Sequence, residues 1–333
     1  VMVMVMMVMG CNSGGVKDPE KVFLSEMVNL GKGFLDVFVS FGDMITGTLG
    51  IKAETKKSDI GKYFSDIEKS MQTTKVKLRE ILEKNGQYEK VKAVVEEFIS
   101  GTVDKIAAGA KEAAKGATGD DKIGGATQAG QDANAADRVA VNLLVKGIKE
   151  IVGVVLKDNE GNAGATKTGD TEKKSIGKLL GEKTNGGTEQ QAAAASATIG
   201  AVSGVDILKA IASSAEAGTG EIKIGEAKNT AEIAASKKED NKEFGVDSVK
   251  KDAVIAGGIA LRGMAKEGKF AAKNGDDGKH ANAINGAVAS AVNKVLSTLV
   301  IAIRNKVDEG LKEINKVLGE IKQGEGSETK VSE

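Results

Sequence analysis

The longest regular pattern in the chain is a series of apolar residues near its C-terminus, spaced three and four apart. It comprises Ile284, Val288, Val292, Val295, Leu299, Ile303, Val307, Leu311, Ile314, Leu318 and Ile321. Such spacing places side chains on one face of an α-helix. The stretch from Val295 to Ile303 is nearly all apolar. The pattern therefore predicts a long helix whose middle is deeply buried.

The same spacing recurs earlier in the chain. It is found in the segments Phe23–Leu49, Ile60–Ile81, Tyr88–Ile106 and Val139–Leu156. The chain contains one proline, Pro19, in 333 residues, and this favours helix because proline disrupts helix interiors. Long helices with short connections are typical of antiparallel bundles. We therefore predict an all-α fold, an elongated antiparallel helical bundle in one domain spanning residues 19–322.

The middle of the chain, residues 107–246, is rich in Gly and Ala and poor in large apolar residues. It predicts loops joined by smaller helices, and we expect it to form one end of the bundle. The helices expected here and just beyond are Thr171–Leu180, Gln190–Ala215 and Val249–Lys266. The polar C-terminal stretch 323–333 is predicted to be disordered.

The N-terminus carries an uncharged apolar run, Val1–Met9, followed by Gly10 and the only cysteine, Cys11. A run of this length before a small residue is typical of a signal peptide and is too short to span a bilayer. Val8-Met9-Gly10-Cys11 resembles a bacterial lipobox. We therefore expect residues 1–10 to be a signal-peptide remnant that begins upstream of Val1, and 11–18 to be a lipidated tether. The alternative is a buried N-terminal strand with a free core thiol.

Lipidation at Cys11 would fix one end of the bundle to a membrane. Stable anchoring requires two signals or more than one acyl chain, and a multiply acylated cysteine meets that requirement. The C-terminal helix is the natural partner of the Phe-rich helix near the N-terminus, so we expect both termini at the membrane-proximal end. The loop-rich region 107–246 would then lie distal to the membrane.

Composition excludes several classes of function. Lys+Arg and Asp+Glu both number 47, a balance that disfavours nucleic-acid binding. A lone cysteine and a lone histidine, His280, cannot build a disulfide framework, a thiolate metal site or a catalytic triad. Gly177–Thr184 departs from the spacing of a phosphate-binding loop, and Asn274–Gly278 lacks the ligands of a calcium loop. We predict no enzyme, no cofactor and no metal.

Three segments resemble a known family. They are FLSEMVNLGKGFLDVFVSFGDMI (23–45), ALRGMAKEGKFA (260–271) and KVLSTLVIAIRNKVDEGLKEIN (294–315). With the lipobox, they resemble the variable large proteins of relapsing-fever spirochaetes and the related recombinational surface antigen of the Lyme spirochaete. Within the second block and the residues before it, we predict that Ile255, Ile259, Leu261 and Met264 face the core; a binding role is the alternative.

The resemblance implies an outer-surface lipoprotein, anchored to the outer membrane through Cys11 and facing host antibodies. One variant would be expressed at a time from a silent repertoire, giving immune evasion by antigenic variation. A second hypothesis is an adhesin that binds a host glycosaminoglycan through lysine pairs. These pairs are Lys56-Lys57, Lys173-Lys174, Lys237-Lys238 and Lys250-Lys251. The sequence gives no oligomeric state.

Overall fold

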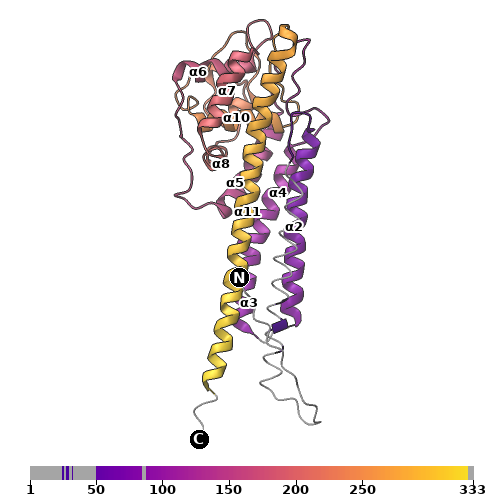
Figure 1. Cartoon of the computed structure of the whole chain (residues 1–333), viewed down its shortest axis with the longest axis vertical. Helices are drawn as coiled ribbons and strands as arrows, with labels where there is room; N and C mark the ends of the chain where they lie inside the picture. Colours follow the sequence, from indigo (N-terminus) through magenta and orange to yellow (C-terminus); the bar gives the residue numbers. More distant parts are fainter. Residues whose placement is uncertain (1–24, 26–27, 30–31, 33–49, 85–87, 329–333) are drawn as a thin grey trace.

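The computed structural model describes residues 25, 28, 29, 32, 50–84 and 88–328. Cys11, the signal remnant 1–10, the tether 11–18 and almost all of the helix predicted over 23–49 lie outside these residues. The described chain forms a rod, with a shaft of long helices at one end and a loop-rich head at the other (Figure 1). The C-terminal helix ends at the shaft end of the rod.

The shaft is built from antiparallel helices, as predicted. The chain descends along one helix, ascends through three consecutive helical segments, descends again, and returns from the head along the longest helix (Figure 1). These elements are α2 (Lys57–Lys84), α3 (Glu89–Phe98), the π-helical turn η1 (Ile99–Val103), α4 (Asp104–Gly116), α5 (Arg138–Val155) and α11 (Lys279–Glu328).

The head contains shorter helices connected by long loops. They are α6 (Asp170–Ser175), η2 (Ile176–Leu180), α7 (Glu189–Ala201), α8 (Gly204–Ala212), η3 (Ile224–Glu226), α9 (Thr230–Ala235), α10 (Asp252–Met264) and η4 (Asp276–Gly278). Extended pairing in the described residues is limited to isolated bridges such as Gln131 with Ala272. The predicted all-α class is therefore confirmed.

The apolar pattern of the C-terminal segment produces a continuous helix, α11. Ten of the eleven residues in that series, all except Ile321 whose side chain is not described, are at most 4% exposed. The helix has a stretch long and apolar enough to cross a membrane, but 56% of that stretch is buried within the fold. It therefore serves as the core helix of the rod.

The prediction of a single helix over Gln190–Ala215 is wrong. The chain forms α7 and α8, which meet at an angle of 96°. Ser203 begins α8: its Oγ accepts from the amide of Asp206 at 3.1 Å, and the Asp206 carboxylate accepts from the Ser203 amide at 2.9 Å. This reciprocal cap is typical of a helix N-terminus, so it starts a new helix where the alanine-rich pattern predicts continuation.

The region 107–246, expected to form one end of the bundle, is not confined to the head. Its first residues complete α4, and the whole of α5 packs against α4 in the shaft. At the other end of the chain, α11 continues to Glu328, so residues 323–328 are helical, contrary to the prediction of disorder. Residues 329–333 lie outside the described part of the chain.

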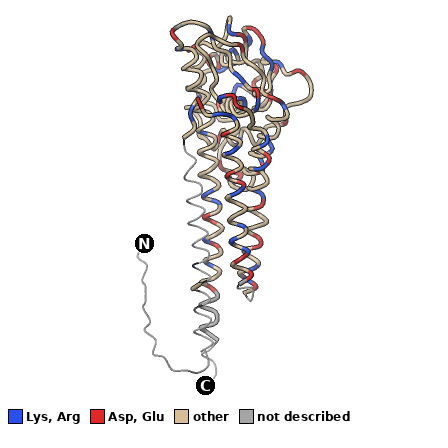
Figure 2. The backbone as a smooth tube through the Cα atoms, turned by 90° about the vertical axis from the view of Figure 1, so that its right-hand side faces the viewer, with Lys and Arg blue, Asp and Glu red and all other residues tan. Residues whose placement is uncertain are grey.

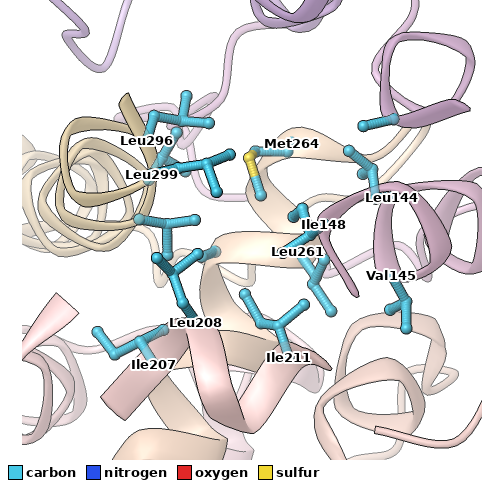
Figure 3. Packing of buried hydrophobic residues seen from close by; sticks show 14 of the residues in the cluster. Leu144, Val145, Ile148, Ile207, Leu208, Ile211, Leu261, Met264, Leu296 and Leu299 are labelled. Atoms are coloured by element: carbon cyan, nitrogen blue, oxygen red, sulfur yellow. The ribbon is translucent and has the colours of Figure 1, made fainter. Parts of the chain in front are cut away.

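The head and the shaft share one core. Leu261 and Met264 of α10 lie at the centre of this core (Figure 3). Around them are Leu144 and Ile148 of α5, Ile207, Leu208 and Ile211 of α8, and Leu296 and Leu299 of α11. Ile255, Ile259, Leu261 and Met264 are at most 2% exposed, which confirms their predicted core position. Burying a large aliphatic side chain contributes about 1.5–3 kcal/mol, so this contact fixes the head on the shaft.

Candidate functional site

The predicted lipidation residue, Cys11, lies outside the described residues, and the structure gives it no geometry. The part of the molecule that remains to be assessed is the exposed surface of the head. Its loops cover the end of the rod opposite the end of α11 and also run along one flank (Figure 1). The loop residues 118–122 and 157–162 are exposed one after another.

Two loops of the head are held by asparagine side chains that belong to shaft helices. On α11, Asn285 accepts from the amide of Ala126 at 2.8 Å and donates to its carbonyl at 3.0 Å. On α5, Asn142 accepts from the amide of Ala217 at 2.8 Å and donates to its carbonyl at 3.2 Å. In both cases the helix side chain holds the loop by its backbone.

The loop that follows α5 is attached in the same way by the first residue of α10. Asp252 is fully buried, and its carboxylate accepts from the amides of Lys167 and Thr168 at 2.5 and 2.9 Å. The Thr168 hydroxyl also donates to it at 2.5 Å. Buried charges require such partners, so Asp252 fixes the position of this loop's backbone. Of its loop partners, only Thr168 contributes a side chain.

Arg262 lies at the end of α10 and is completely buried. Its Nη1 donates to the carbonyls of Ala234 and Ser236, both at 3.0 Å, and its Nε donates to the backbone carbonyl of Lys269 at 2.9 Å. The guanidinium also lies 5.8 Å from the centre of the Phe270 ring. A cation near the C-terminus of a helix is favourable, and Arg262 here closes the C-terminus of α9. Burial lowers its pKa to about 9.

Lys57, the first residue of α2, has the corresponding role for the C-terminus of α10. Its side chain is completely buried, and Nζ donates to the carbonyls of Arg262, Gly263 and Ala265 at 3.1, 2.6 and 2.7 Å. Burial lowers the pKa of Lys57 to about 7, while Asp121 acts in the opposite direction. The start of α2 is thus tied to the end of α10.

Sequence reasoning missed these three buried charged residues. Asp252 and Arg262 stand in the family-like region, where only the apolar positions were assigned to packing. An arginine between Leu261 and Gly263 in an otherwise apolar run is the available signal, because a charge in a buried helix needs partners. For Lys57 the sequence offers only its place in the Lys56-Lys57 pair.

The lysine pairs proposed for glycosaminoglycan binding are engaged within the chain. Each pair contributes at least one amino group to an internal contact. Besides Lys57, these contacts are Lys56–Asp120, Lys173–Asp170, Lys237–Glu221, Lys238–Asp132 and Lys250–Asp247. Positive and negative residues are also interspersed along the head and the shaft (Figure 2). This arrangement does not favour binding of a polyanion, and we do not propose it.

The two motifs rejected on spacing adopt ordinary structures. Gly177–Thr184 comprises most of η2 and the loop after it, and Asn274–Gly278 forms a turn around η4. In the residues that the structure describes, no cluster of three or more His, Cys, Asp or Glu side chains is placed to hold a metal ion. The candidate functional site is therefore the surface formed by the exposed loops of the head, together with the buried side chains that hold these loops in place.

Comparison with known proteins assigns the chain to a family. The family model described as Borrelia lipoprotein matches residues 34–318. The chain belongs to the Borrelia lipoprotein family. Variable large protein 4 of Borrelia hermsii is 55% identical over 332 residues, covering 98% of this chain and 94% of the relative. Variable large protein 17 of the same organism is 55% identical over 307 residues, covering 91% and 86%.

The fold of the chain also matches a solved structure. The crystal structure of the Lyme disease variable surface antigen VlsE of Borrelia burgdorferi superposes with a TM-score of 0.78 and 36% sequence identity. The match covers 90% of this chain and all of that chain. The suggested family resemblance and the helical fold are thus confirmed, and the chain is a member of a family of variable surface lipoproteins.

Proposed function

We propose that this chain is a lipid-anchored protein of the outer membrane, facing the host, and that it mediates immune evasion by antigenic variation. In this proposal Cys11 carries the acyl chains, the shaft rises from the membrane, and the head presents its loops to antibodies. One variant is expressed at a time from a silent repertoire. Relatives named as variable large proteins and as a variable surface antigen support this proposal.

The observation that carries the proposal is the way in which the loops are attached. Asn285, Asn142 and Asp252 mainly contact loop amides and carbonyls, which every residue except proline provides in the same form. Loop side chains can therefore change while their attachments persist. Surface substitutions away from special contacts usually alter stability by about ±0.5 kcal/mol. Antibody contacts could thus be rewritten without unfolding the protein.

Two experiments test the anchor and the exposure. Metabolic labelling with a radioactive fatty acid should label the native chain, and Cys11→Ser should abolish the label. Brief protease treatment of intact cells should cut the exposed loop 157–162. An unlabelled native chain, or a loop that is cut only after cell lysis, would contradict the proposal.

A third experiment tests the variation itself. We expect the sequences expressed by sibling clones of one cell lineage to differ mainly in the loops of the head and to agree along α2 and α11. Differences spread evenly over the shaft and the head would contradict the proposal. No catalytic role is proposed, since the named relatives are variable surface proteins.

A further inference from the structure

A groove lies where the head meets the shaft. The end of α5, the loop after it and the start of α8 form one wall, and α11 forms the other. Its volume is about 530 Å³. The apolar part of its lining consists of Val155, Leu156, Val205, Ile301 and Ala302.

Ile301 projects from the α11 wall of this groove. Its side chain is 58% exposed, whereas the following residue, Ala302, is buried. Complete burial of an isoleucine side chain contributes about 1.5–3 kcal/mol, and an exposed isoleucine lacks most of this contribution. A protruding apolar side chain next to an apolar groove is a self-complementary pair, because each molecule offers both the knob and the hole.

The polar residues at the groove carry both signs of charge on each wall. On α11, Lys306 pairs with Glu309 at 3.0 Å. On the opposite wall, the loop after α5 carries Lys157 and Glu160. The pKa of Glu309 is lowered mainly by Lys306 and to a smaller extent by Lys157 across the groove. A partner therefore needs an apolar centre with both charges around it. A second copy of this chain supplies that pattern, and its formal net charge of zero does not oppose close approach.

The groove continues toward the shaft end between α11, the π-helical turn and α5. Lys306 and Glu309 belong to both parts. Gly101 and Gly153 line this continuation, and a Cβ added at either would meet nothing within 4 Å. The backbone of these two residues is therefore open to close approach from outside the molecule.

We propose that two copies of this chain associate laterally, with the Ile301 side chain of each inserted into the groove of the other. The two rods lie parallel around a two-fold axis, so the same surface is used twice. This arrangement rests on the proposed function, because anchoring in one membrane would orient both rods alike and hold them at the same height. The contact is small, and the concentration imposed by a shared surface would promote it.

The test uses the purified full chain tethered to vesicles through a C-terminal histidine tag on nickel-bearing lipids. This tether places the shaft end at the vesicle and does not depend on acylation of Cys11. A photo-crosslinking amino acid replaces Ile301, and the control replaces Val139, which is 66% exposed at the start of α5. We expect dimers from position 301 that increase with density on the vesicle, and few from position 139. Equal yields, no dimer, or crosslinks to lipid alone would overturn the proposal.

A pair of substitutions separates contact from folding. Dimer yield is read through a common photo-crosslinker at position 305, since Asn305 also lines the groove. Ile301→Glu should reduce the dimer yield about tenfold, the loss expected from one buried aliphatic side chain, while helical circular dichroism stays unchanged. Val139→Glu should change neither. An equal loss in both variants would overturn the proposal.

The vesicle test is independent of the proposed function. If acylation and cell-surface cleavage are observed but vesicle-bound dimers are not, only the lateral association fails. If dimers form on vesicles but the native chain is neither acylated nor exposed, the proposed function fails and the contact remains a property of the chain.

Discussion

The shaft and the head of this molecule are held together by different kinds of contact. In the shaft, side chains pack on side chains, and helices α4 and α5 approach so closely that a Cβ on Gly147 would lie 2.3 Å from the carbonyl oxygen of Gly109. In the head, short helices and loops depend on buried polar side chains that bind backbone groups, as Asp252 and Arg262 do.

This difference determines which side chains can be substituted without loss of stability and which cannot. In a packed helix interface, a change in the volume of any side chain alters the packing and therefore the stability. In a loop held by its amides and carbonyls, most side-chain substitutions leave the attachments and the stability unchanged. Variation is therefore expected in the head loops, provided that the few polar residues that hold them remain. The predictions below test this contrast, from the largest expected effect to the smallest.

The largest effect is expected from Arg262→Met. Removing the guanidinium takes one donor from each of the carbonyls of Ala234, Ser236 and Lys269. The amides of Ala136 and Asn134 still donate to Ala234 and Lys269, whereas a buried carbonyl that loses its donor, as that of Ser236 does, costs about 1–3 kcal/mol. With the weakened contacts of the other two carbonyls added, we expect the free energy of unfolding to fall by about 3 kcal/mol in urea denaturation. Arg304→Met is the control, because Arg304 is exposed on α11; it should change stability by about 0.5 kcal/mol or less. Similar losses in both variants would remove the special role of the buried arginine.

A smaller loss is expected from Gly147→Ala in the shaft. The added methyl group would collide with the Gly109 carbonyl and with the amide of Ala113, and overpacking costs about 1–3 kcal/mol. Gly153→Ala on the same helix is the matched control, since its Cβ has open space. It should stabilise the monomer by up to about 1 kcal/mol. Thermal unfolding of both variants measures this difference; equal signs would contradict close packing of α4 and α5.

Lys57 gives the connection between shaft and head a dependence on pH. Its pKa is lowered from 10.5 to about 7 in the folded chain, so between these values the unfolded chain binds more protons. Stability should consequently rise as pH increases from about 7 to 10, by at most about 1.4 kcal/mol per pH unit from this group. Urea denaturation at several pH values measures the slope. Lys57→Met should reduce it, and an unchanged slope would show that another group is responsible.

The smallest effect is expected in the loop after α5. Asp158 and Asn159 are exposed, so replacing both by alanine should change stability by about 0.5 kcal/mol or less. Binding of antibodies raised against the folded head should nevertheless fall when they contact this loop, which surface plasmon resonance can measure. A large loss of stability would show that loop side chains are part of the framework.

The sequence was sufficient to predict the shaft but only part of the head. The apolar series along α11 and α5 is a local pattern, and it identifies both the helices and their buried faces. The bend between α7 and α8 was missed because an alanine-rich stretch obscured the cap at Ser203. The contacts of Lys57 join residues more than 200 positions apart, and no local spacing encodes such a pair. Cys11 stays a prediction.

The 50 residues of α11 form one continuous helix, about 75 Å long at 1.5 Å per residue. If the shaft end faces the membrane as proposed, this helix runs from the membrane side of the rod into the head and holds the head away from the membrane. Because the helix is continuous, every copy would present its loops at the same distance from the shaft end. On a crowded cell, large molecules arriving from outside would meet that uppermost layer first, and whatever lies between the stems would be screened by it.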